Sequence, residues 1–535
     1  MTEKKPEKST KMHEQVEKRL KNWPAQGGKE PAGSGPGKKS GGNSGNTGAG
    51  ITTDFVLKCL DANEMGDGVL FAMLHDGCFV ANKSSDTWLK WSGHHWRIDF
   101  KGECKDAVEA VAAAYVKAGA ELVRKIDWAL KKNDRGSAEA LQLKQKQLYR
   151  RVSRLRSEKG RVNCLKFTAN NPQNALRIVG DEIDRMPWLL ACANGVINLK
   201  TGDLEAGRPE DYLLKACPTE WKGVEESCEL WERILTEIFG GDQELIDYLQ
   251  RLFGYGVTGL TREAILPIFH GIGRNGKTLI TETIAHVLGP DLARPINGEM
   301  LLAQGHARNP GAPSPDIMSL RGARIVFASE TDQNRAFSLA RVKLLSGGDT
   351  LVGRSPHDKF EITFRPSHLL ILSTNHVPHA ASNDFAFFER VHLVPFKLSF
   401  VDREPQNANE RRADPQLGDK LKAEASGILA WLVRGCIQWQ EMGLCPPEEV
   451  RAATRTFQRN EDLLADFIEE SCFVNNDSST CVPAAELYDA YSEWHRENVG
   501  KNPVKVQKFG RLMKDKGFEK KKSGKLYYLG LRLLA

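Results

Sequence analysis

Four short apolar runs stand out between positions 264 and 396, and none of them alternates between apolar and polar residues. A strand buried on both faces of a parallel sheet has this pattern. Helical stretches separate the runs, which is typical of α/β architecture. The pattern therefore predicts a parallel central sheet with strands at 264–270, 324–329, 368–373 and 391–396.

The flanking sequence predicts a different mixture of elements. Residues 88–97 hold three tryptophans around a Ser-Gly turn and predict a strand–turn–strand unit, whose aromatic rings either form a hairpin core or stack on bases. Residues 194–202 predict a tight β unit. The periodicity predicts helices at 105–132, 137–158, 229–239 and 242–255, mostly helical structure over 401–470, then helices at 484–497 and 505–516 and a hairpin over 517–533.

These elements predict five segments. A Gly-, Lys- and Ser-rich tail covers 1–51 and has almost nothing to bury, which is typical of a disordered linker. We expect a mixed α/β accessory domain at 52–228, the α/β core at 229–400, a helical connection at 401–470 and a winged-helix domain at 471–535.

Composition excludes several classes of protein. With 535 residues, of which 40% are hydrophobic, the chain can bury cores in several domains. No run approaches the ~20 apolar residues of a membrane helix, and the amino terminus lacks the apolar core of a secretory signal. The eleven cysteines form no Cys-x-x-Cys pair, so neither a zinc knuckle nor a thioredoxin motif is indicated. We expect a reduced, cytoplasmic protein without membrane contact.

The net charge of +6 is unevenly distributed. Residues 1–50 hold ten Lys or Arg and five Asp or Glu, and residues 501–535 hold eleven and two, so the stretch between them is acidic overall. Basic ends on an acidic body indicate an anionic partner at the termini, with a merely solubilising tail as the alternative.

One motif has a specific chemistry. Residues 271–278 read Gly-Ile-Gly-Arg-Asn-Gly-Lys-Thr, follow an apolar run and open a helical stretch, which is the context of a P-loop. Backbone N–H groups of such a loop bind phosphates, the lysine reaches the β- and γ-phosphates, and the threonine ligates Mg²⁺. The predicted nucleotide-binding residues are Gly271, Gly273, Arg274, Asn275, Gly276, Lys277 and Thr278.

Three further residues fit ATP hydrolysis. The 324–329 run is followed by Glu330, which we expect to polarise the attacking water and hold Mg²⁺ with Thr278. The 368–373 run leads to Asn375, an amide placed to sense the γ-phosphate. Arg390 precedes the last run and is a candidate arginine finger acting in trans. A solvated strand-end Glu330 and a surface Arg390 are the alternatives.

Together these motifs resemble the superfamily 3 helicases of viruses and plasmids, and more narrowly the helicase part of phage/plasmid and poxvirus-type primase-helicases. The resemblance covers about 187–535 and is best at 264–396; the segments 344–349, 360–366 and 194–202 strengthen it. It implies an AAA+-like P-loop ATPase fold, ATP and Mg²⁺ as cofactors, and a hexameric ring that translocates on single-stranded DNA.

The sequence departs from that family in one place. Many members end the second motif with two adjacent carboxylates, whereas this chain has Ser329 and Glu330, so the role of a second carboxylate is open. No Asp-x-Asp is present and about 135 residues precede the matching region, so a primase active site is not supported. Residues 52–186 receive no explanation from the resemblance.

Two basic segments are candidate DNA contacts. Residues 350–364 predict a hairpin, and by the resemblance its tip would enter the ring channel, with His357 and Lys359 at the tip and Arg354 near the base; the alternative is an ordinary surface hairpin. The winged helix would contact duplex phosphates, unless it serves only protein contacts, through Lys508, Arg511, Lys520, Lys521 and Lys522.

We therefore expect an ATP-dependent DNA helicase of phage or plasmid replication that acts on single-stranded and forked DNA, with a primase or polymerase as a further partner. Two alternatives stay open. One is a DNA-binding oligomeric ATPase that melts origins or loads other proteins without processive unwinding. The other is a protein-remodelling ATPase.

Overall fold

The computed structural model describes residues 51–170, 177–178, 182–304, 312–329, 335–356, 361–462, 464–475, 477, 479–498, 500 and 502–534. The chain divides into an amino-terminal unit, up to Ser92 and from Trp96 to Ile183, and a carboxy-terminal unit, Gly93–His95 and Asp184–Ala535. Except for Ile51, the segment predicted as a tail lies outside the described residues. The predicted domain boundary at 228 stays a prediction.

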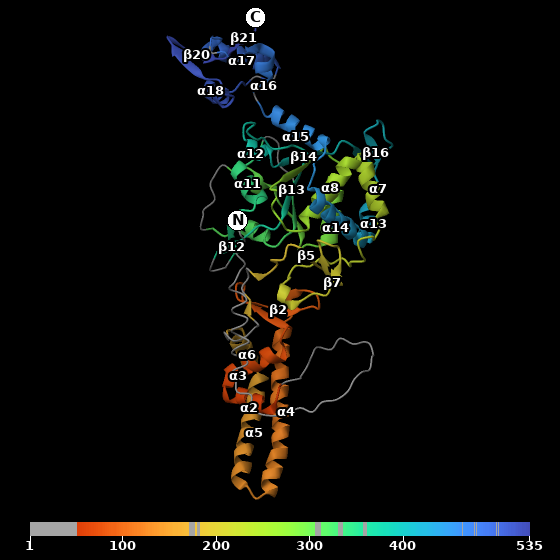
Figure 1. Ribbon diagram of the computed structural model, residues 1–535, viewed down its shortest axis with the longest axis vertical. Coiled ribbons are helices and arrows are strands. Elements are labelled where there is room, and N and C mark those ends of the chain that lie inside the picture. The colour runs from red at the N-terminus through yellow and green to blue at the C-terminus, as the bar shows by residue number, and fades with distance from the viewer. Residues whose placement is uncertain are drawn as a thin grey trace. The chain divides into compact units, whose positions relative to one another are not determined.

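The amino-terminal unit is a helical assembly with a small sheet. A long antiparallel helical hairpin, α4 and α5, reaches past α2 and α3 in Figure 1. The sheet has the order β3-β2-β1-β4. The elements are α2 (Thr53–Asp61), α3 (Asn63–Leu74), β1 (Phe79–Asn82), β2 (Thr87–Trp91), β3 (Trp96–Ile98), α4 (Glu103–Lys131), α5 (Arg135–Leu155), α6 (Glu158–Asn170) and β4 (Arg177–Ile178).

The helices of this unit share one apolar core and one buried ion pair. Tyr115 of α4 and Leu148 of α5 are fully buried in that core. Asp67 of α3 is buried too, and it accepts hydrogen bonds from Arg151 Nε at 3.0 Å and from Tyr115 Oη at 2.9 Å. A buried carboxylate is tolerated because it is paired and hydrogen-bonded, so this cluster fixes α3 against α4 and α5.

The predicted aromatic hairpin is confirmed as β2 and β3. Trp91 and Trp96 lie opposite each other in the ladder, with ring centroids 5.3 Å apart, and Trp96 is buried. Trp88 packs against the helical core through Phe71. These contacts favour the hairpin-core reading over base stacking.

The carboxy-terminal unit contains the predicted parallel sheet, whose order is β14-β8-β13-β10-β9. All four neighbouring pairs are parallel. The four predicted strands are confirmed as β8 (Leu266–His270), β10 (Ile325–Ser329), β13 (Leu369–Thr374) and β14 (Val391–Pro395). Because the order places β13 between β8 and β10, residues at the ends of these three strands are neighbours.

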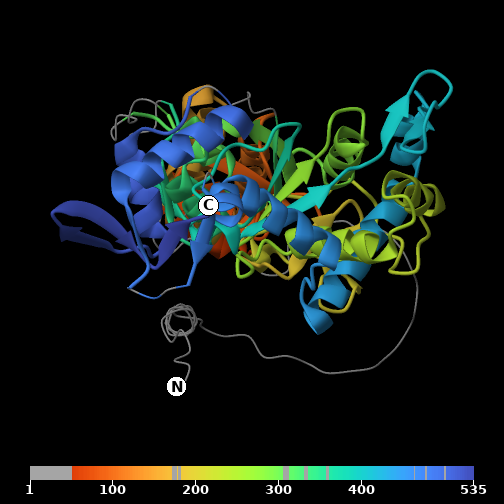
Figure 2. The ribbon, with the colours of Figure 1, turned by 90° about the horizontal axis from the view of Figure 1, so that it is seen from above.

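Alternate residues of these strands enter two different cores. In β13, Leu369 and Ile371 belong to one core, and Leu370 and Leu372 belong to the other. The first core is lined by helices that include α8 (Gln243–Gly256) and α14 (Ala425–Met442), which lie side by side in Figures 1 and 2. Both faces are therefore covered, which explains why the runs do not alternate.

The strands that the sequence analysis missed include an edge strand of the central sheet and a short parallel pair. The edge strand β9 (Ala293–Asn297) includes Arg294 and Pro295, which interrupt any apolar run, and a proline is tolerated because the strand is at an edge. The parallel pair β15 (Ser399–Val401) and β16 (Glu410–Arg412) lies in the segment predicted to be mostly helical. Each of these two strands has three residues, which is too short for a period to show.

The tight β unit and the helices predicted at 229–239 and 242–255 are also confirmed within a few residues, and the unit has further helices for which no bounds were predicted. The tight β unit is β5 (Leu189–Cys192), β6 (Gly195–Asn198) and β7 (Leu204–Glu205). The helices are α7 (Glu229–Ile238), α8, α9 (Lys277–Leu288), α10 (Pro315–Ser319), α11 (Leu339–Ser346), α12 (Phe385–Phe388), α13 (Leu417–Ala423), α14, α15 (Glu448–Asn460) and α16 (Ala465–Ser471), with 3-10 turns η2 (Pro209–Asp211) and η3 (Gly298–Leu301).

The last segment contains the helices and the hairpin expected of it. They are α17 (Ala484–Asn498), α18 (Val506–Asp515) and the hairpin β19 (Lys520–Ser523) and β20 (Lys525–Leu529), to which β18 (Cys481–Pro483) adds a third strand. β17 (Cys472–Val474) pairs with β21 (Leu531–Leu533). Phe509 and Met513 of α18 are buried in this segment's own core. Its assignment as a winged helix stays a proposal.

The hairpin expected at 350–364 is formed by β11 (Leu351–Gly353) and β12 (Ile362–Phe364), which pair antiparallel. At its base, Arg354 N donates to Ser314 Oγ and Ser314 N donates to Arg354 O, so the first strand is fixed to α10. The predicted tip residues His357 and Lys359 lie outside the described residues. In the part of the chain that the structure describes, no helix is long and apolar enough to cross a membrane.

Candidate active site

The loop from Gly271 to Gly276 joins the carboxyl end of β8 to the first turn of α9. Gly276 has φ +84° and is the N-cap of α9, so no side chain occupies the first N–H groups of the helix. A Cβ on Gly271 would lie 2.6 Å from the carbonyl oxygen of Phe396, so only glycine fits there. The loop therefore presents a free helix N-terminus, which is a site for anions.

Asn275 holds this loop in place. It is 3% exposed, its Nδ2 donates to the carbonyls of Phe396 and Leu398 at 3.3 and 2.8 Å, and its Oδ1 accepts from Gly273 N at 2.6 Å. One amide thus ties the loop to the chain that follows β14. The sequence analysis predicted Asn275 as a nucleotide contact and missed this bracing role, because its partners lie more than 120 residues away.

Lys277 points back into the loop. Its Nζ donates to the Gly271 carbonyl at 2.8 Å, to Asn275 Oδ1 at 3.3 Å and to Asn375 Oδ1 at 3.0 Å. The side chain is 7% exposed, and burial lowers the pKa of its ammonium. Burial and the charge of Lys277 also lower the pKa of His270, the last residue of β8.

The contact between Lys277 and Asn375 brings together two residues that the sequence singled out separately. Asn375 follows β13, and Thr374 at the end of that strand pairs with His270 of β8. Ser329 at the end of β10 pairs with Ser373 on the other side of β13. Glu330, the predicted catalytic carboxylate and Mg²⁺ ligand, directly follows Ser329 and lies outside the described residues.

Two other residues that were predicted to bind the nucleotide, Arg274 and Thr278, are exposed. Thr278 is exposed in the first turn of α9. Arg274 is exposed, has φ +51°, and its Nη1 lies 2.9 Å from Asp402 Oδ2. The sequence analysis did not name Asp402, and no motif marks it. Among the described residues, no group of three or more His, Cys, Asp or Glu is arranged to hold a metal ion.

Arg390 lies at the amino-terminal ends of the strands, whereas the loop lies at their carboxyl ends. It precedes β14, and Val391 pairs with Leu266 at the start of β8, whereas the loop follows the end of β8. β8 has five residues, so its two ends are about 15 Å apart. Arg390 Nη1 donates to the Ala264 carbonyl at 3.1 Å, and its buried Nε has no hydrogen-bond partner. The structure therefore does not bring Arg390 to the loop of its own chain.

Arg324 is a buried cation that the sequence analysis counted only as part of a strand. Its guanidinium donates to the carbonyls of Thr258, Pro187, Met186 and Leu189. Burial lowers its pKa to about 10. These hydrogen bonds hold the segment 186–189 against the residue that precedes β10, so the role of Arg324 is structural.

Comparison with known proteins finds a family model and several viral relatives that are similar to this chain. The family model "D5 N terminal like" matches residues 69–240. "Putative helicase L207/L206" of Acanthamoeba polyphaga mimivirus is 24% identical over 333 residues, which is 60% of this chain and 34% of that protein. "Putative helicase 121R" of Invertebrate iridescent virus 3 is 25% identical, over 61% of this chain and 37% of the relative. "Putative primase C962R" of African swine fever virus is 22% identical, over 59% and 34%.

These matches make the chain similar to viral putative helicases and a putative primase, at 22–25% identity. The chain spans little more than a third of the length of these three viral relatives. Among solved structures, the NrS-1 C terminal region has 12% identity and a TM-score of 0.39, over 62% of this chain and 88% of that one. A TM-score this low does not establish that the two proteins share a fold.

The family match corrects one expectation. The resemblance to primase-helicases was expected to begin near residue 187, but the family model begins at residue 69. Most of the amino-terminal unit therefore lies within the range that this family model matches. That unit is built from helices and a short sheet without a nucleotide-binding motif, so its sequence offered no pattern that could be tied to a chemistry.

Proposed function

We propose that this chain is an ATP-dependent DNA helicase of superfamily 3 that unwinds duplex DNA in replication as a ring around a single strand. The observation that carries the proposal is the contact of Lys277 with Asn375 beside the free N-terminus of α9. This arrangement suits a nucleoside triphosphate, because the loop would bind its phosphates and the amide would lie near the terminal one.

The roles of the residues follow from their positions. The N–H groups at the start of α9 and the Lys277 ammonium would bind the β- and γ-phosphates. Lys277 would then exchange its present hydrogen bonds for bonds to phosphate oxygens. The Thr278 hydroxyl and Glu330 would hold Mg²⁺, and Glu330 would orient the attacking water. Bound Mg·ATP supplies the anhydride bond and the charge that balances Lys277.

Arg390 supports an assembly of several copies. In its own chain it is about 15 Å of strand away from the loop, so it would complete the site of a neighbouring subunit. A heterologous interface that closes into a ring gives every site the same neighbour. We propose a homo-hexamer on this basis.

Two basic elements would hold the DNA. The β11–β12 hairpin would place His357 and Lys359, with Arg354 at its base, on the single strand inside the ring. On the last segment, Lys508 and Arg511 of α18 and Lys520, Lys521 and Lys522 of β19 are exposed and would contact duplex phosphates. The names of the viral relatives support a role in DNA replication, where a primase or polymerase would be a partner.

Hydrolysis measurements test the proposal. The wild-type chain should hydrolyse ATP faster with single-stranded DNA present, Lys277→Ala should lose hydrolysis, and Glu330→Gln should bind the nucleotide but turn over very slowly. Hydrolysis that DNA does not stimulate would favour a protein-remodelling ATPase. Near-normal turnover by Glu330→Gln would give its role to another residue, with Asp332 as the nearest candidate.

A further inference from the structure

The helical hairpin of α4 and α5 has an exposed surface to which the proposed function assigns no ligand. α4 has 29 residues, which is about 43 Å of helix. Its outer part packs on α5 through small and apolar residues such as Ala118, Leu122 and Ala129, which are buried. The outward faces of both helices are exposed along this length.

These outward faces are basic, although the chain between its termini is acidic. Residues 116–150 hold nine Lys or Arg and four Asp or Glu. Two of the nine approach carboxylates of α2: Lys125 lies 3.7 Å from Asp54, and Lys144 pairs with Asp61. The excess of cations remains, so this surface fits an anionic partner.

Large apolar side chains lie among these cations. Trp128 is 61% exposed, and the ammonium of Lys132 lies 4.0 Å from the centre of its ring. Lys117, Arg124, Trp128 and Lys131 follow one another at steps of seven, four and three residues, which places them on one side of α4. Tyr149 of α5 is 45% exposed.

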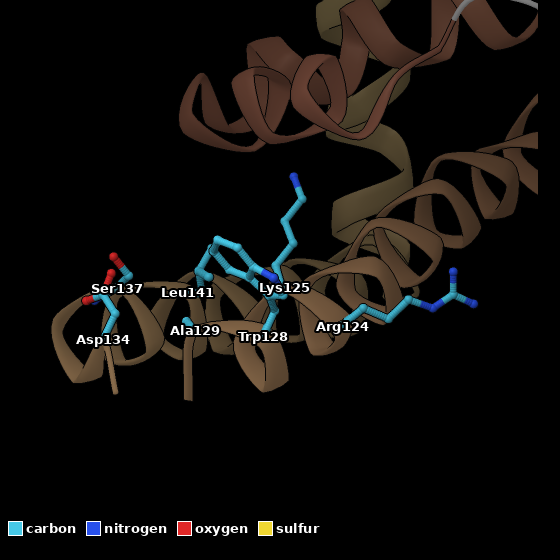
Figure 3. Close-up of a pocket in the computed structure, with 7 residues that line it drawn as sticks. All are labelled: Arg124, Lys125, Trp128, Ala129, Asp134, Ser137 and Leu141. Carbon is cyan, nitrogen blue, oxygen red and sulfur yellow. The ribbon is translucent and has the colours of Figure 1, made fainter. Parts of the chain in front are cut away.

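Next to Trp128 the surface is hollowed. Figure 3 shows the indole ring beside Leu141, with Lys125 rising next to it and Asp134 and Ser137 at the start of α5. Arg124 lies one turn away along α4, and its side chain extends away from the indole ring. The hollow thus has an apolar wall of Trp128, Ala129 and Leu141 and cations at its rim.

We propose that this face of the α4–α5 hairpin binds a single strand of nucleic acid, with a base stacked on Trp128 and phosphates on Arg124, Lys125 and Lys132. Aromatic rings among cations bind single strands because any unpaired base offers a face for stacking. A duplex hides its base faces and could use only the cations. An apolar protein partner would leave the excess positive charge unpaired. The inference rests on the proposed function for the identity of its ligand and assigns a contact outside the ATPase core.

The test measures binding of fluorescent dT30, and of a 30-base-pair duplex, to the full chain without nucleotide over a range of salt concentrations. Trp128→Ala should weaken dT30 binding about tenfold, since stacking on one aromatic ring is worth roughly 1–3 kcal/mol. Arg124→Gln, Lys125→Gln and Lys132→Gln together should make the slope of log K against log salt shallower by about 2, at roughly 0.7 per phosphate.

The matched control removes the same charge elsewhere in the unit through Lys58→Gln, Lys83→Gln and Lys101→Gln, which are exposed and lie off the hairpin. Equal losses in control and hairpin variants would overturn the inference, as would a Trp128→Ala loss that is as large for duplex. A dT30 carrying 5-iodouracil should cross-link to wild-type residues 124–132, and cross-links only elsewhere would also overturn it. DNA-stimulated hydrolysis with unchanged dT30 binding by all variants would reject this surface and leave the proposed function standing.

Discussion

Asn275 and Asn375 both accept a hydrogen bond from the ammonium of Lys277, but they differ in burial and in their other contacts. Asn275 is buried and braces the loop against the Phe396 and Leu398 carbonyls. Asn375 is exposed beyond the end of β13 and is free to follow a ligand.

Substituting the two amides should therefore separate binding from turnover. Asn275→Ala removes the side-chain donor to the Phe396 and Leu398 carbonyls, which costs about 1–3 kcal/mol, and should weaken nucleotide binding at least fivefold. Asn375→Ala should leave nucleotide affinity within about threefold and lower kcat roughly a hundredfold, as for loss of one oriented polar group. Titration with a fluorescent nucleotide and steady-state hydrolysis measure both. The reverse pattern would contradict the assignment.

His392 provides a test of burial at a single residue. Its Nδ1 shares a hydrogen bond of 2.6 Å with Tyr248 Oη, and burial lowers the pKa of His392 to about 4. An unfolded histidine titrates near 6.5, so between these values the unfolded chain binds the extra proton. Stability due to His392 is therefore present above pH 6.5 and lost as the pH falls towards 4.

The variant His392→Gln keeps an acceptor for Tyr248 and removes this titration. Relative to the variant, the wild type should lose up to about 3 kcal/mol of unfolding free energy between pH 6.5 and pH 4. Urea unfolding followed at several pH values measures the difference. Parallel pH profiles for the two proteins would show that His392 is protonated normally in the folded state.

At the scale of the residue, the sequence indicated Lys277 because it belongs to the P-loop motif at 271–278, and Asn375 because it follows the apolar run at 368–373. It could not indicate the bracing by Asn275, the pair of Arg274 with Asp402, or the carbonyl network of Arg324. These contacts join positions more than 60 residues apart, and only the folded sheet brings them together.

Among the elements, the strands β8, β10, β13 and β14 were predictable because burial on both faces leaves an unbroken apolar run. β9 was not, because an edge strand can include Arg294 and Pro295. The hairpin β11–β12 was predictable from its alternating residues, and its predicted tip residues, His357 and Lys359, lie outside the described residues.

The exposed strand β19 leads to a prediction on duplex binding. Lys520→Gln, Lys521→Gln and Lys522→Gln together should make the salt slope for duplex shallower by about 2.7, at roughly 0.9 per phosphate. Unwinding of a fork on which the protein is already loaded should be unaffected. A matched control removes the exposed Lys222, Lys397 and Lys420 in the same way. A slope that changes equally in both variants would reject β19 as a duplex contact.

At the scale of the whole molecule, the proposed role of Arg390 in trans would need a second copy of the chain. Arg390→Ala and Lys277→Ala should each be inactive alone, and a mixture should regain hydrolysis, because some interfaces then join an intact loop to an intact arginine. Random mixing of equal amounts would restore roughly a quarter of the sites in a closed ring of heterologous interfaces. Light scattering must show that mixed rings form. Mixed rings without any hydrolysis would contradict the role in trans.

The amino-terminal unit shows what sequence reasoning could not reach at this scale. Periodicity predicted α4 and α5 but not α2, α3 or α6, and the similarity of this unit to a known family came from the family model and not from a motif. A helical hairpin has no sequence pattern specific to one function, so its function has to be argued from exposed groups such as Trp128.

Unwinding of forked DNA tests the central claim most directly. The wild-type chain with Mg·ATP should separate a labelled fork with a single-stranded tail of one polarity, and Lys277→Ala at the same concentration should not. Binding of the fork by Lys277→Ala, checked by a gel shift, would show that the loss lies in hydrolysis. If the wild type hydrolyses ATP in response to single-stranded DNA but separates neither fork polarity, the chain is not a helicase, and a DNA-dependent ATPase without unwinding takes its place.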